Sequence, residues 1–369
     1  MLNSERKLFR KVQKTIFLET ERLRNLHSGL GQFCWHLGQA LCQQADESLR
    51  FTFFVPSQCR GIFGQNVDYQ TVSPVYKFFP ISQKQDIWHV FHQDSAYWPS
   101  RLSTHRPKVI LTIHDLNFLE RADYSLAKKR QKLASLQQKI DRADVLTTIS
   151  DYTASVIKTH LQIGQKPLHV IHNGNSLVPV SLSDFSIPDK LKSIRINQFL
   201  FTIGVVHPKK NFHVLLPLLQ QNPDLQLVIA GNIANPYSQE IIEIAQTLGV
   251  ANRLLLLGNI ADETKYWLFQ HCLAFVFPSL SEGFGLPVVE AMSVGKPVFL
   301  SNLTSLPEIG GDAAYYWQNT NPSHLQAIFE QGMADYQANV SKKTILQAQA
   351  NRFTWQKAAE KYLLLYKNI

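Results

Sequence analysis

Short apolar runs alternate along the chain with longer stretches in which apolar positions follow a helical period. In the first half the apolar runs predict strands at 15–20, 51–56, 87–91, 108–114, 144–150 and 168–172. Runs such as 51–55 and 109–111 are apolar at consecutive positions, which is typical of parallel strands buried on both faces. Helices are predicted at 32–42 and 125–140.

The second half repeats this arrangement. Strands are predicted at 199–206, 225–230, 253–257, 274–277, 298–301 and 313–316, and helices at 212–220, 239–248, 262–272 and 287–294. The alternation predicts an α/β protein with two doubly wound parallel sheets. Gly174, Pro179 and Pro188 interrupt the pattern between 173 and 197. We therefore expect one lobe at 1–185 and a second at 186–353.

The turn at 278–290 carries the strongest chemical signal. It follows a predicted strand and leads into a helix, which is where doubly wound folds bind ligands. Gly283 and Gly285 let the backbone approach a ligand, and the N–H groups at the helix start attract an anion. Glu282 and Glu290 add acceptors for hydroxyl groups. These features fit a sugar joined to a phosphate; alternatively, the glycines only shape a tight turn.

A second turn, at 203–211, follows the first predicted strand of the second lobe. Gly204 is followed there by the paired lysines Lys209 and Lys210. Two cations beside a glycine turn at a helix start suit a diphosphate. The alternative is a pair of solvated lysines.

The residues Glu-Gly-Phe-Gly-Leu-Pro-Val-Val-Glu-Ala-Met at 282–292 resemble the signature of retaining glycosyltransferases of family 4, which have the GT-B fold. The resemblance continues through 295–298 and 305–314. It implies two Rossmann-like lobes facing a central cleft and a last helix, at about 354–369, that crosses back to the first lobe. It also implies that Glu290 holds the ribose hydroxyls of a nucleotide sugar and that Glu282 lies near the donor sugar.

The resemblance extends to three further elements. Lys209 and Lys210 match a Pro-Arg-Lys-Asn element whose basic pair neutralises the leaving diphosphate, although Lys209 stands where many members have arginine, so bidentate phosphate contact is lost. Gly29 and Gly31 resemble the glycine-rich loop beneath the donor phosphates. His114 matches a histidine close to the reacting sugar; alternatively, it is a core histidine.

These considerations give a set of expected site residues. Expected catalytic residues are His114, Lys210 and Glu282; expected donor-binding residues are Gly29, Gly31, Gly204, Lys209, Lys210, Ile260, Gly283, Phe284, Gly285, Leu286 and Glu290. His92 and Asp94 follow the strand at 87–91 and are expected to touch acceptor hydroxyls. Histidines with metal-ligand spacing and a reliable Asp-x-Asp site are both lacking, so we expect neither a metal nor another cofactor.

Composition and charge exclude several classes of protein and indicate the cellular location and partners to expect. The chain has 369 residues, of which 45% are apolar and 18% charged, which excludes disordered, collagen-like and coiled-coil proteins. Apolar runs are too short for a membrane span or a signal segment, and the four cysteines form no C-x-x-C pair, so a cytoplasmic protein is expected. The net charge is +8 over 1–185 and +1 over 186–369. Basic clusters at 6–14 and 128–142 predict either an anionic partner or solvated helix faces.

The sequence thus favours a retaining glycosyltransferase that moves a hexose from a nucleoside diphosphate to a hydroxyl of a glycan or lipid-linked acceptor in bacterial surface polysaccharide or lipopolysaccharide synthesis. GDP-mannose is the favoured donor, with dTDP-rhamnose or a UDP-sugar as alternatives. The basic lobe would dock on the inner face of the cytoplasmic membrane. The rivals are another GT-B activity, such as a hexosyl phosphorylase or an epimerase, and a non-catalytic polyanion-binding protein. No nucleic-acid partner is expected, because basic and aromatic residues do not interleave.

Overall fold

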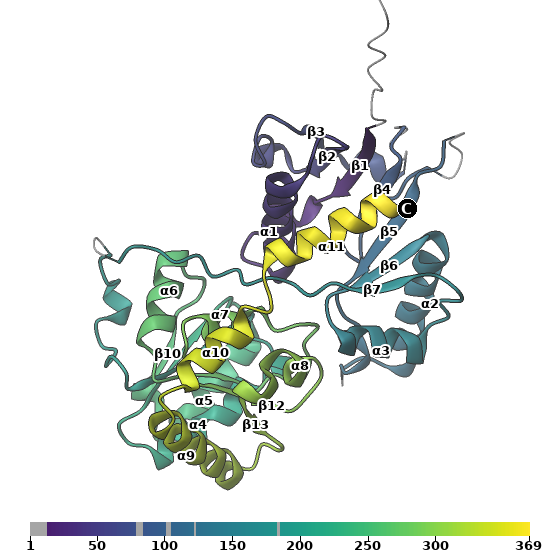
Figure 1. Ribbon diagram of the computed structural model, residues 1–369. Helices are drawn as coiled ribbons and strands as arrows, with labels where there is room; N and C mark the ends of the chain where they lie inside the picture. The colour runs from purple at the N-terminus through teal and green to yellow at the C-terminus, as the bar shows by residue number, and fades with distance from the viewer. Residues whose placement is uncertain (1–12, 79–83, 101–104, 122, 183–184) are drawn as a thin grey trace, which may run out of the picture.

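The computed structural model describes residues 13–78, 84–100, 105–121, 123–182 and 185–369, which form two lobes (Figure 1). Each lobe is built on one sheet, and every paired strand runs parallel to its neighbour. The prediction of two doubly wound lobes is therefore confirmed. Among the described residues, no helix combines the length and the apolar character needed to cross a membrane.

The first lobe contains a seven-stranded sheet of order β3-β2-β1-β4-β5-β6-β7. Its strands are β1 (Lys14–Glu19), β2 (Leu49–Val55), β3 (Asp68–Thr71), β4 (Ile87–Val90), β5 (Lys108–Ile113), β6 (Val145–Thr148) and β7 (Leu168–Val170). The helices are α1 (Gly29–Gln44), α2 (Leu126–Arg142) and α3 (Asp151–His160). The strand order reverses between β1 and β4, so a ligand crevice is expected at the carboxyl ends of these strands.

The second lobe contains a six-stranded sheet of order β10-β9-β8-β11-β12-β13. Its strands are β8 (Phe199–Ile203), β9 (Gln226–Ala230), β10 (Leu254–Leu256), β11 (Ala274–Phe277), β12 (Val298–Ser301) and β13 (Tyr315–Trp317). The helices are α4 (Leu216–Gln221), α5 (Pro236–Thr247), α6 (Asp262–His271), α7 (Leu286–Ser293), α8 (Leu306–Gly310), α9 (Pro322–Ala338) and α10 (Lys342–Ala350). Here the order reverses between β8 and β11.

The last helix, α11 (Trp355–Asn368), returns to the first lobe and packs on α1, as Figure 1 shows. The hydroxyl of Tyr366 lies 2.7 Å from Nδ1 of His89, which is a residue of β4. The linker after β7 passes under this helix at Gly174, where a Cβ atom would lie 2.1 Å from the backbone nitrogen of Trp355. The last helix therefore crosses back to the first lobe, as the resemblance implies.

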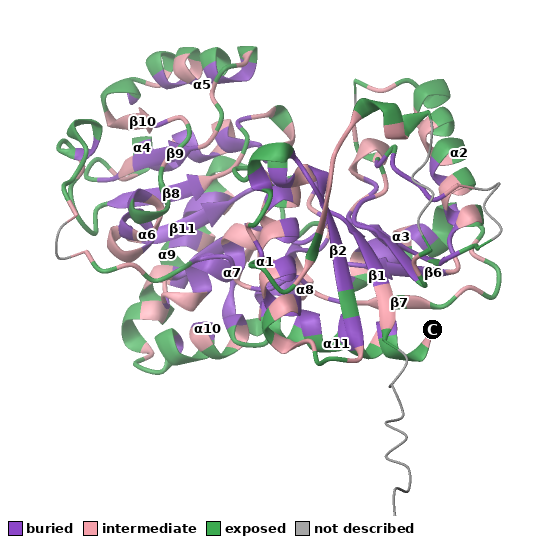
Figure 2. Ribbon diagram, turned by 90° about the horizontal axis from the view of Figure 1, so that it is seen from above, coloured by how far each residue is buried: buried purple, intermediate pink, exposed green. Residues whose placement is uncertain are grey.

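The elements differ in how far their residues are buried, and this difference affects how well a strand can be predicted from its sequence. The central strands of both sheets are buried, whereas α2 exposes much of its outer surface (Figure 2). The edge strand β3 was not predicted, because its four residues are only half-buried or exposed and form no apolar run. The helices α3, α8, α9 and α10 were not predicted either. The two sheets are joined by the connection at 171–198, which contains the expected domain boundary.

Candidate active site between the two lobes

The lobes touch at the turn that precedes α7. A Cβ atom on Gly283 would lie 2.3 Å from the carbonyl oxygen of His114 and 3.0 Å from Cβ of Asp115. The hydroxyl of Ser150, at the start of α3, donates to the carbonyl oxygen of Gly283 over 2.7 Å. Only glycine fits at position 283. The predicted donor turn of the second lobe and the predicted histidine of the first are therefore brought together.

Lys210 and Glu282 form a buried ion pair at this junction. Nζ of Lys210 bonds Oε1 of Glu282, and the hydroxyl of Ser279 donates to the same oxygen over 2.6 Å. The aliphatic part of Lys210 crosses Gly204, where a Cβ atom would lie 3.2 Å from Cε of the lysine. Gly204 has a φ of 153°, which favours glycine at this position. The turns after β8 and after β11 thus supply the two charges.

Burial acts on both members of this pair. It lowers the pKa of Lys210, although the charge of Glu282 opposes the shift. Burial alone would raise the pKa of Glu282, but the charges of Lys210 and Lys209 outweigh it, and the pKa of this carboxyl is lowered. The pair lies in a largely buried site, where charges interact more strongly than at a surface. A diphosphate entering beside it would compete with Glu282 for the ammonium group.

Glu290 lies on α7, with 4% of its surface exposed. Its Oε1 accepts from Nζ of Lys265, a residue of α6, over 3.1 Å. Nζ of Lys265 also lies 3.7 Å from Oδ1 of the exposed Asp262. Lys265 was not among the predicted residues, because a single lysine in the first turns of a helix carries no sequence signal.

The turn between the two glutamates is shaped by a glycine with a positive φ and by side-chain hydrogen bonds to its backbone. Gly285 has a φ of 105° and immediately precedes α7, in a conformation that side chains rarely adopt. The hydroxyl of Ser305 donates to the carbonyl oxygens of Glu282 and Phe284 over 3.1 and 3.0 Å. Phe284 itself is buried and packs edge-on against Phe353, so only its backbone could reach a ligand. This arrangement leaves the start of α7 ready to accept an anion.

The other predicted donor residues lie at or just before the starts of three helices, α1, α6 and α7. Ser28 caps α1 by accepting from the backbone N–H of Gly31 over 3.0 Å, and a Cβ atom on Gly31 would overlap the carbonyl oxygen of Asn25. Gly29 has open space around it. Ile260 is half-buried just before α6, and Leu286 is half-buried at the first position of α7.

His114 lies at the end of β5 with its ring buried. Nε2 lies 2.7 Å from the carbonyl oxygen of Phe91, and the ring packs edge-on against Phe33 at 4.6 Å between centroids. Burial lowers the pKa of His114 to about 4, so the ring is neutral at pH 7. Gln93 joins this turn to the one after β4, since its side chain bonds the backbone N–H of His114 and the carbonyl oxygen of Asp115.

His92 and Asp94 lie differently, although both were predicted to touch an acceptor. The ring of His92 is buried against Nε of Arg22 at 3.0 Å, and burial lowers its pKa to about 2. Asp94 lines the inter-lobe cavity. Its backbone N–H lies 3.1 Å from Nδ1 of His92. The histidine therefore supports the turn that carries the aspartate.

The cavity between the lobes has a volume of about 750 Å³. The first lobe contributes to its wall Gln93, Asp94, Asp115, Asn117, Phe118, Glu120, Arg121, Asp123, Tyr124, Lys132, Ser135, Leu136 and Lys139; the second lobe contributes Val205, His207, Pro208, Lys209, Leu280 and Ser281. Asp115 was not predicted, although it follows His114 directly. Burial raises the pKa of its carboxyl, and Oδ1 accepts from the backbone N–H of Asn117 over 2.9 Å.

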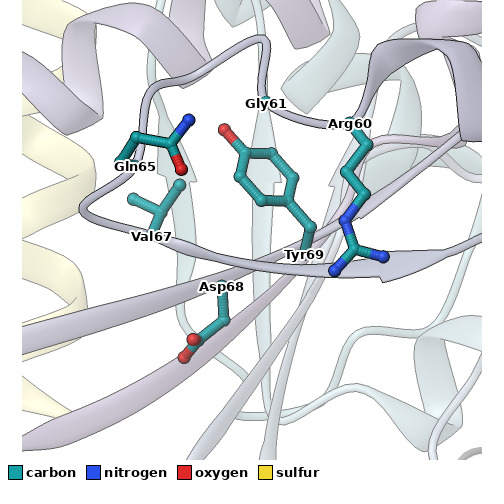
Figure 3. Close-up of a pocket in the computed structure, with 6 residues that line it drawn as sticks. All are labelled: Arg60, Gly61, Gln65, Val67, Asp68 and Tyr69. Carbon is teal, nitrogen blue, oxygen red and sulfur yellow. The ribbon is translucent and has the colours of Figure 1, made fainter.

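A second cavity, of about 420 Å³, lies beside β3 at the edge of the first sheet (Figure 3). The hydroxyl of Tyr69 donates to the carbonyl oxygen of Gly64 and accepts from the backbone N–H of Phe63, both over 2.8 Å. Asp68, which also lines this cavity, is paired with Arg50 at 2.7 Å. None of the predicted site residues lines it.

Two clusters among the described residues bring three metal-ligand side chains together: Glu19, Glu21 and His92 in one, and Asp151, His172 and Glu308 in the other. Arginines adjoin the first, since Arg22 contacts His92 and Arg24 contacts Glu21. In the second, Glu308 already accepts from the backbone N–H groups of Asp151 and Tyr152 and lies 2.6 Å from Nε2 of His172. We propose a metal at neither cluster.

Comparison with known proteins places this cleft in a family. Residues 186–351 match the family described as Glycosyl transferases group 1, and residues 28–177 match Glycosyltransferase Family 4. The chain is 26% identical over 291 residues to the O-antigen chain mannosyltransferase B of Escherichia coli, covering 76% of this chain and 74% of that protein.

One further relative and one solved structure extend the comparison. The chain is 28% identical to the UDP-Gal:alpha-D-GlcNAc-diphosphoundecaprenol alpha-1,3-galactosyltransferase of Escherichia coli, with 79% of this chain and 76% of that protein covered. Among solved structures, Anabaena Alr3699/HepE in complex with UDP superposes with a TM-score of 0.70 and 18% identity, over 97% of this chain and 100% of the other. The chain belongs to the glycosyltransferases of family 4, and its two-lobed architecture is the GT-B fold.

Proposed function

We propose that this enzyme transfers mannose, with retention of configuration, from GDP-mannose to a hydroxyl group of a glycan or lipid-linked acceptor in O-antigen or related surface polysaccharide synthesis. The observation that carries this proposal is the buried Lys210–Glu282 pair beside the glycine turn, at the point where the lobes meet. The mannosyltransferase among the relatives supports mannose as the sugar.

The donor would lie along the second lobe. Glu290, on α7, would accept the ribose hydroxyls, and the start of α7 with Lys209 and Lys210 would hold the diphosphate. The transition state gains negative charge on the departing diphosphate, so fixed cations beside it stabilise the transition state more than the ground state. Because Lys210 is already in place, little reorganisation is needed when this charge develops.

The acceptor would occupy the inter-lobe cavity. Asp94 and Asp115 offer carboxylate oxygens there, and Lys209 reaches the same cavity from the second lobe. In the proposed reaction the acceptor oxygen bonds the anomeric carbon on the face from which the diphosphate departs. The bond between sugar and diphosphate breaks, and a phosphate oxygen takes the acceptor proton. This route needs no side-chain nucleophile, and His114, held neutral, would line the sugar site without moving a proton.

Basic residues and a helix start would take the place of a cation in this reaction. Activity is therefore expected to survive an excess of EDTA. Loss of activity that Mn²⁺ or Mg²⁺ restores would contradict this part of the proposal.

The basic face of the first lobe would hold the enzyme at an anionic membrane. Lys128, Lys129, Arg130 and Lys132 lie on α2 beside Leu126, which is 72% exposed. The other predicted basic cluster, at 6–14, lies almost wholly outside the described residues. Each basic residue near an anionic surface contributes about 1 kcal/mol. Vesicles with phosphatidylglycerol should sediment the protein at low salt, and charge reversal of the four residues on α2 should release it.

The donor proposal is tested by thermal stabilisation with GDP, UDP and dTDP, with a single-stranded oligonucleotide as the comparison. GDP is expected to raise the melting temperature most. A UDP-sugar is the second candidate, which the galactosyltransferase relative and the UDP complex of the structural neighbour favour. Stabilisation by the oligonucleotide alone, fading with salt, would instead favour a polyanion-binding protein.

A further inference from the structure

The ion pair between Glu290 and Lys265 has no role in the scheme above. Both partners are buried: 6% of the Glu290 side chain and 12% of the Lys265 side chain are exposed. Removing two charges from water costs several kcal/mol per ion, and well-packed apolar side chains are often as stabilising as such a pair. The pair therefore need not stabilise the fold. Because Glu290 is a predicted donor-binding residue, the pair is a candidate for a role in the site.

The geometry leaves one carboxylate oxygen of Glu290 available. Nζ of Lys265 lies 3.1 Å from Oε1, and no described residue donates a hydrogen bond to Oε2. Lys265 comes from α6, whereas Glu290 comes from α7, so the contact ties two helices that begin at or near the predicted donor residues Ile260 and Leu286. A carboxylate fixed through one oxygen presents the other in a defined direction.

Neighbouring charges determine the protonation states of Lys265 and of the histidine near it. Burial lowers the pKa of Lys265, but the nearby charges of Glu290 and Asp262 outweigh it and the pKa is raised, so the side chain is ionised at pH 7. Across the cleft, burial together with the charge of Lys265 lowers the pKa of His36 in α1 to about 4. His36 is therefore neutral at pH 7 and adds no second positive charge beside Lys265.

We propose that Lys265 is a positioning residue for the nucleotide: it holds Oε1 of Glu290 so that Oε2 accepts from the ribose hydroxyls, which makes the enzyme select ribonucleotide donors over 2′-deoxyribonucleotide donors. This inference rests on the proposed role of Glu290. The inference restricts the substrate class to sugars carried on ribonucleoside diphosphates. Donors carried on dTDP, whose sugar lacks the 2′-hydroxyl, would bind poorly.

The test compares nucleotide pairs that differ only at the 2′-hydroxyl. Calorimetry gives the dissociation constants of GDP and 2′-deoxy-GDP, and of UDP and 2′-deoxy-UDP, for the wild type. A lost hydrogen bond to a charged group corresponds to a roughly tenfold to hundredfold change. The wild type should therefore prefer the ribonucleotide of the base it binds by at least about tenfold, and Lys265→Met should reduce this preference to less than threefold.

Two variants serve as references. Lys342→Met removes another lysine of the second lobe with a largely buried side chain, whose Nζ lies 3.2 Å from Asp335, and it should keep the full preference. Glu290→Gln should abolish the preference in the same way as Lys265→Met. Lys265→Gln, which keeps a polar side chain of similar length, replaces the methionine variant if that variant does not fold.

The outcomes separate the two ideas. If Lys265→Met keeps the preference while Glu290→Gln loses it, the inference about Lys265 is overturned and the proposed role of Glu290 stands. If Glu290→Gln also keeps it, or if the wild type binds neither ribonucleotide, the placement of the donor fails. A wild type that binds dTDP as tightly as GDP and UDP overturns the selectivity.

Discussion

The two walls of the cleft differ in how their charged side chains are buried and paired. On the second lobe, three of the charged side chains predicted to meet the donor are largely buried and paired: Lys210 with Glu282, and Glu290 with Lys265, which was not predicted. On the first lobe, the cavity wall carries carboxylates and cations side by side, many of them partly exposed, such as Asp94 and Lys132. Buried pairs are sensitive to the loss of one partner, whereas exposed charges contribute little individually.

This contrast matches the tasks proposed for each wall. A nucleoside diphosphate presents fixed charges and hydroxyls, so a preorganised wall lowers the cost of stabilising the transition state. An acceptor glycan presents many equivalent hydroxyls, which an open wall of mixed charge can bind in several ways. Substitutions on the second lobe should therefore have large effects on turnover, and those on the first lobe should have smaller effects on acceptor affinity.

The largest effect is expected for Lys210→Ala. Loss of one preorganised contact to a developing charge costs about 2.7–4 kcal/mol, so kcat should fall roughly a hundredfold to a thousandfold. The donor KM should change less, because the charge grows toward the transition state. Lys209→Ala is the matched control, with a smaller loss expected from a side chain that is only half-buried. A Lys210→Ala rate within threefold of the wild type would remove Lys210 from the site.

Glu290→Ala should come next. A hydrogen bond to a charged group contributes about 1.5–3 kcal/mol, so GDP should bind roughly tenfold to a hundredfold more weakly. Calorimetry measures this directly, and circular dichroism shows whether the variant is folded. Unchanged GDP affinity in a folded variant would contradict the assignment of the ribose site to α7.

A moderate effect on stability is expected from a contact between the two lobes. Glu308, on α8, accepts from the backbone N–H groups of Asp151 and Tyr152 at the start of α3, over 2.9 and 3.0 Å. Loss of a capping side chain costs about 0.5–2 kcal/mol, so Glu308→Ala should lower the free energy of unfolding in urea by about that much at pH 7. The exposed Glu243→Ala is the control.

The pH dependence of this difference has a definite sign. Burial alone would raise the pKa of Glu308, but its hydrogen bonds to His172 and to the two backbone N–H groups outweigh it and lower the pKa below the ordinary value of 4.5. The stabilisation is therefore complete above about pH 4.5 and is lost as the pH falls through the folded-state value. The gap between wild type and variant should shrink in acid; a gap that widens there would refute the capping role.

The smallest effect should come from the first lobe. Asp115→Asn replaces a carboxyl group in the acceptor cavity by an amide but keeps the shape of the side chain. A net hydrogen bond contributes about 0.5–1.5 kcal/mol, so the acceptor KM should rise only about threefold to tenfold. Nucleotide affinity should stay the same, as calorimetry can check. Weaker GDP binding with an unchanged acceptor KM would move Asp115 to the donor side.

Among the strands, the sequence predicted most accurately those that are apolar throughout. The strands β11 and β12 were predicted with the bounds that the structure gives, because all of their residues are buried. The strand β3 escaped prediction because an edge strand is buried on neither face. The helix α9 escaped although it is 17 residues long, since its buried positions include Gln326 and Gly332, which weaken the apolar period.

In the candidate site, too, some features could be predicted from the sequence and others could not. Glu282, Glu290 and Lys210 were predicted from local motifs, but their ion pairs were not, because Lys210 and Glu282 are 72 positions apart and Lys265 belongs to no motif. Adjacency along the chain misled in the first lobe: His92 follows a strand but turns inward to Arg22, whereas Asp115, which was not predicted, faces the cavity. Such side-chain directions depend on contacts between distant segments.

The most direct test of the central claim is sugar transfer itself. The enzyme would be incubated with GDP-mannose, UDP-galactose or dTDP-rhamnose and a panel of mannosides and diphosphoundecaprenol-linked glycans, with products identified by mass spectrometry. We predict a mannosylated product from GDP-mannose that the Lys210→Ala variant makes at least a hundredfold more slowly. Product formed at the same rate by wild type and variant would contradict the account, as would a lack of product from every donor.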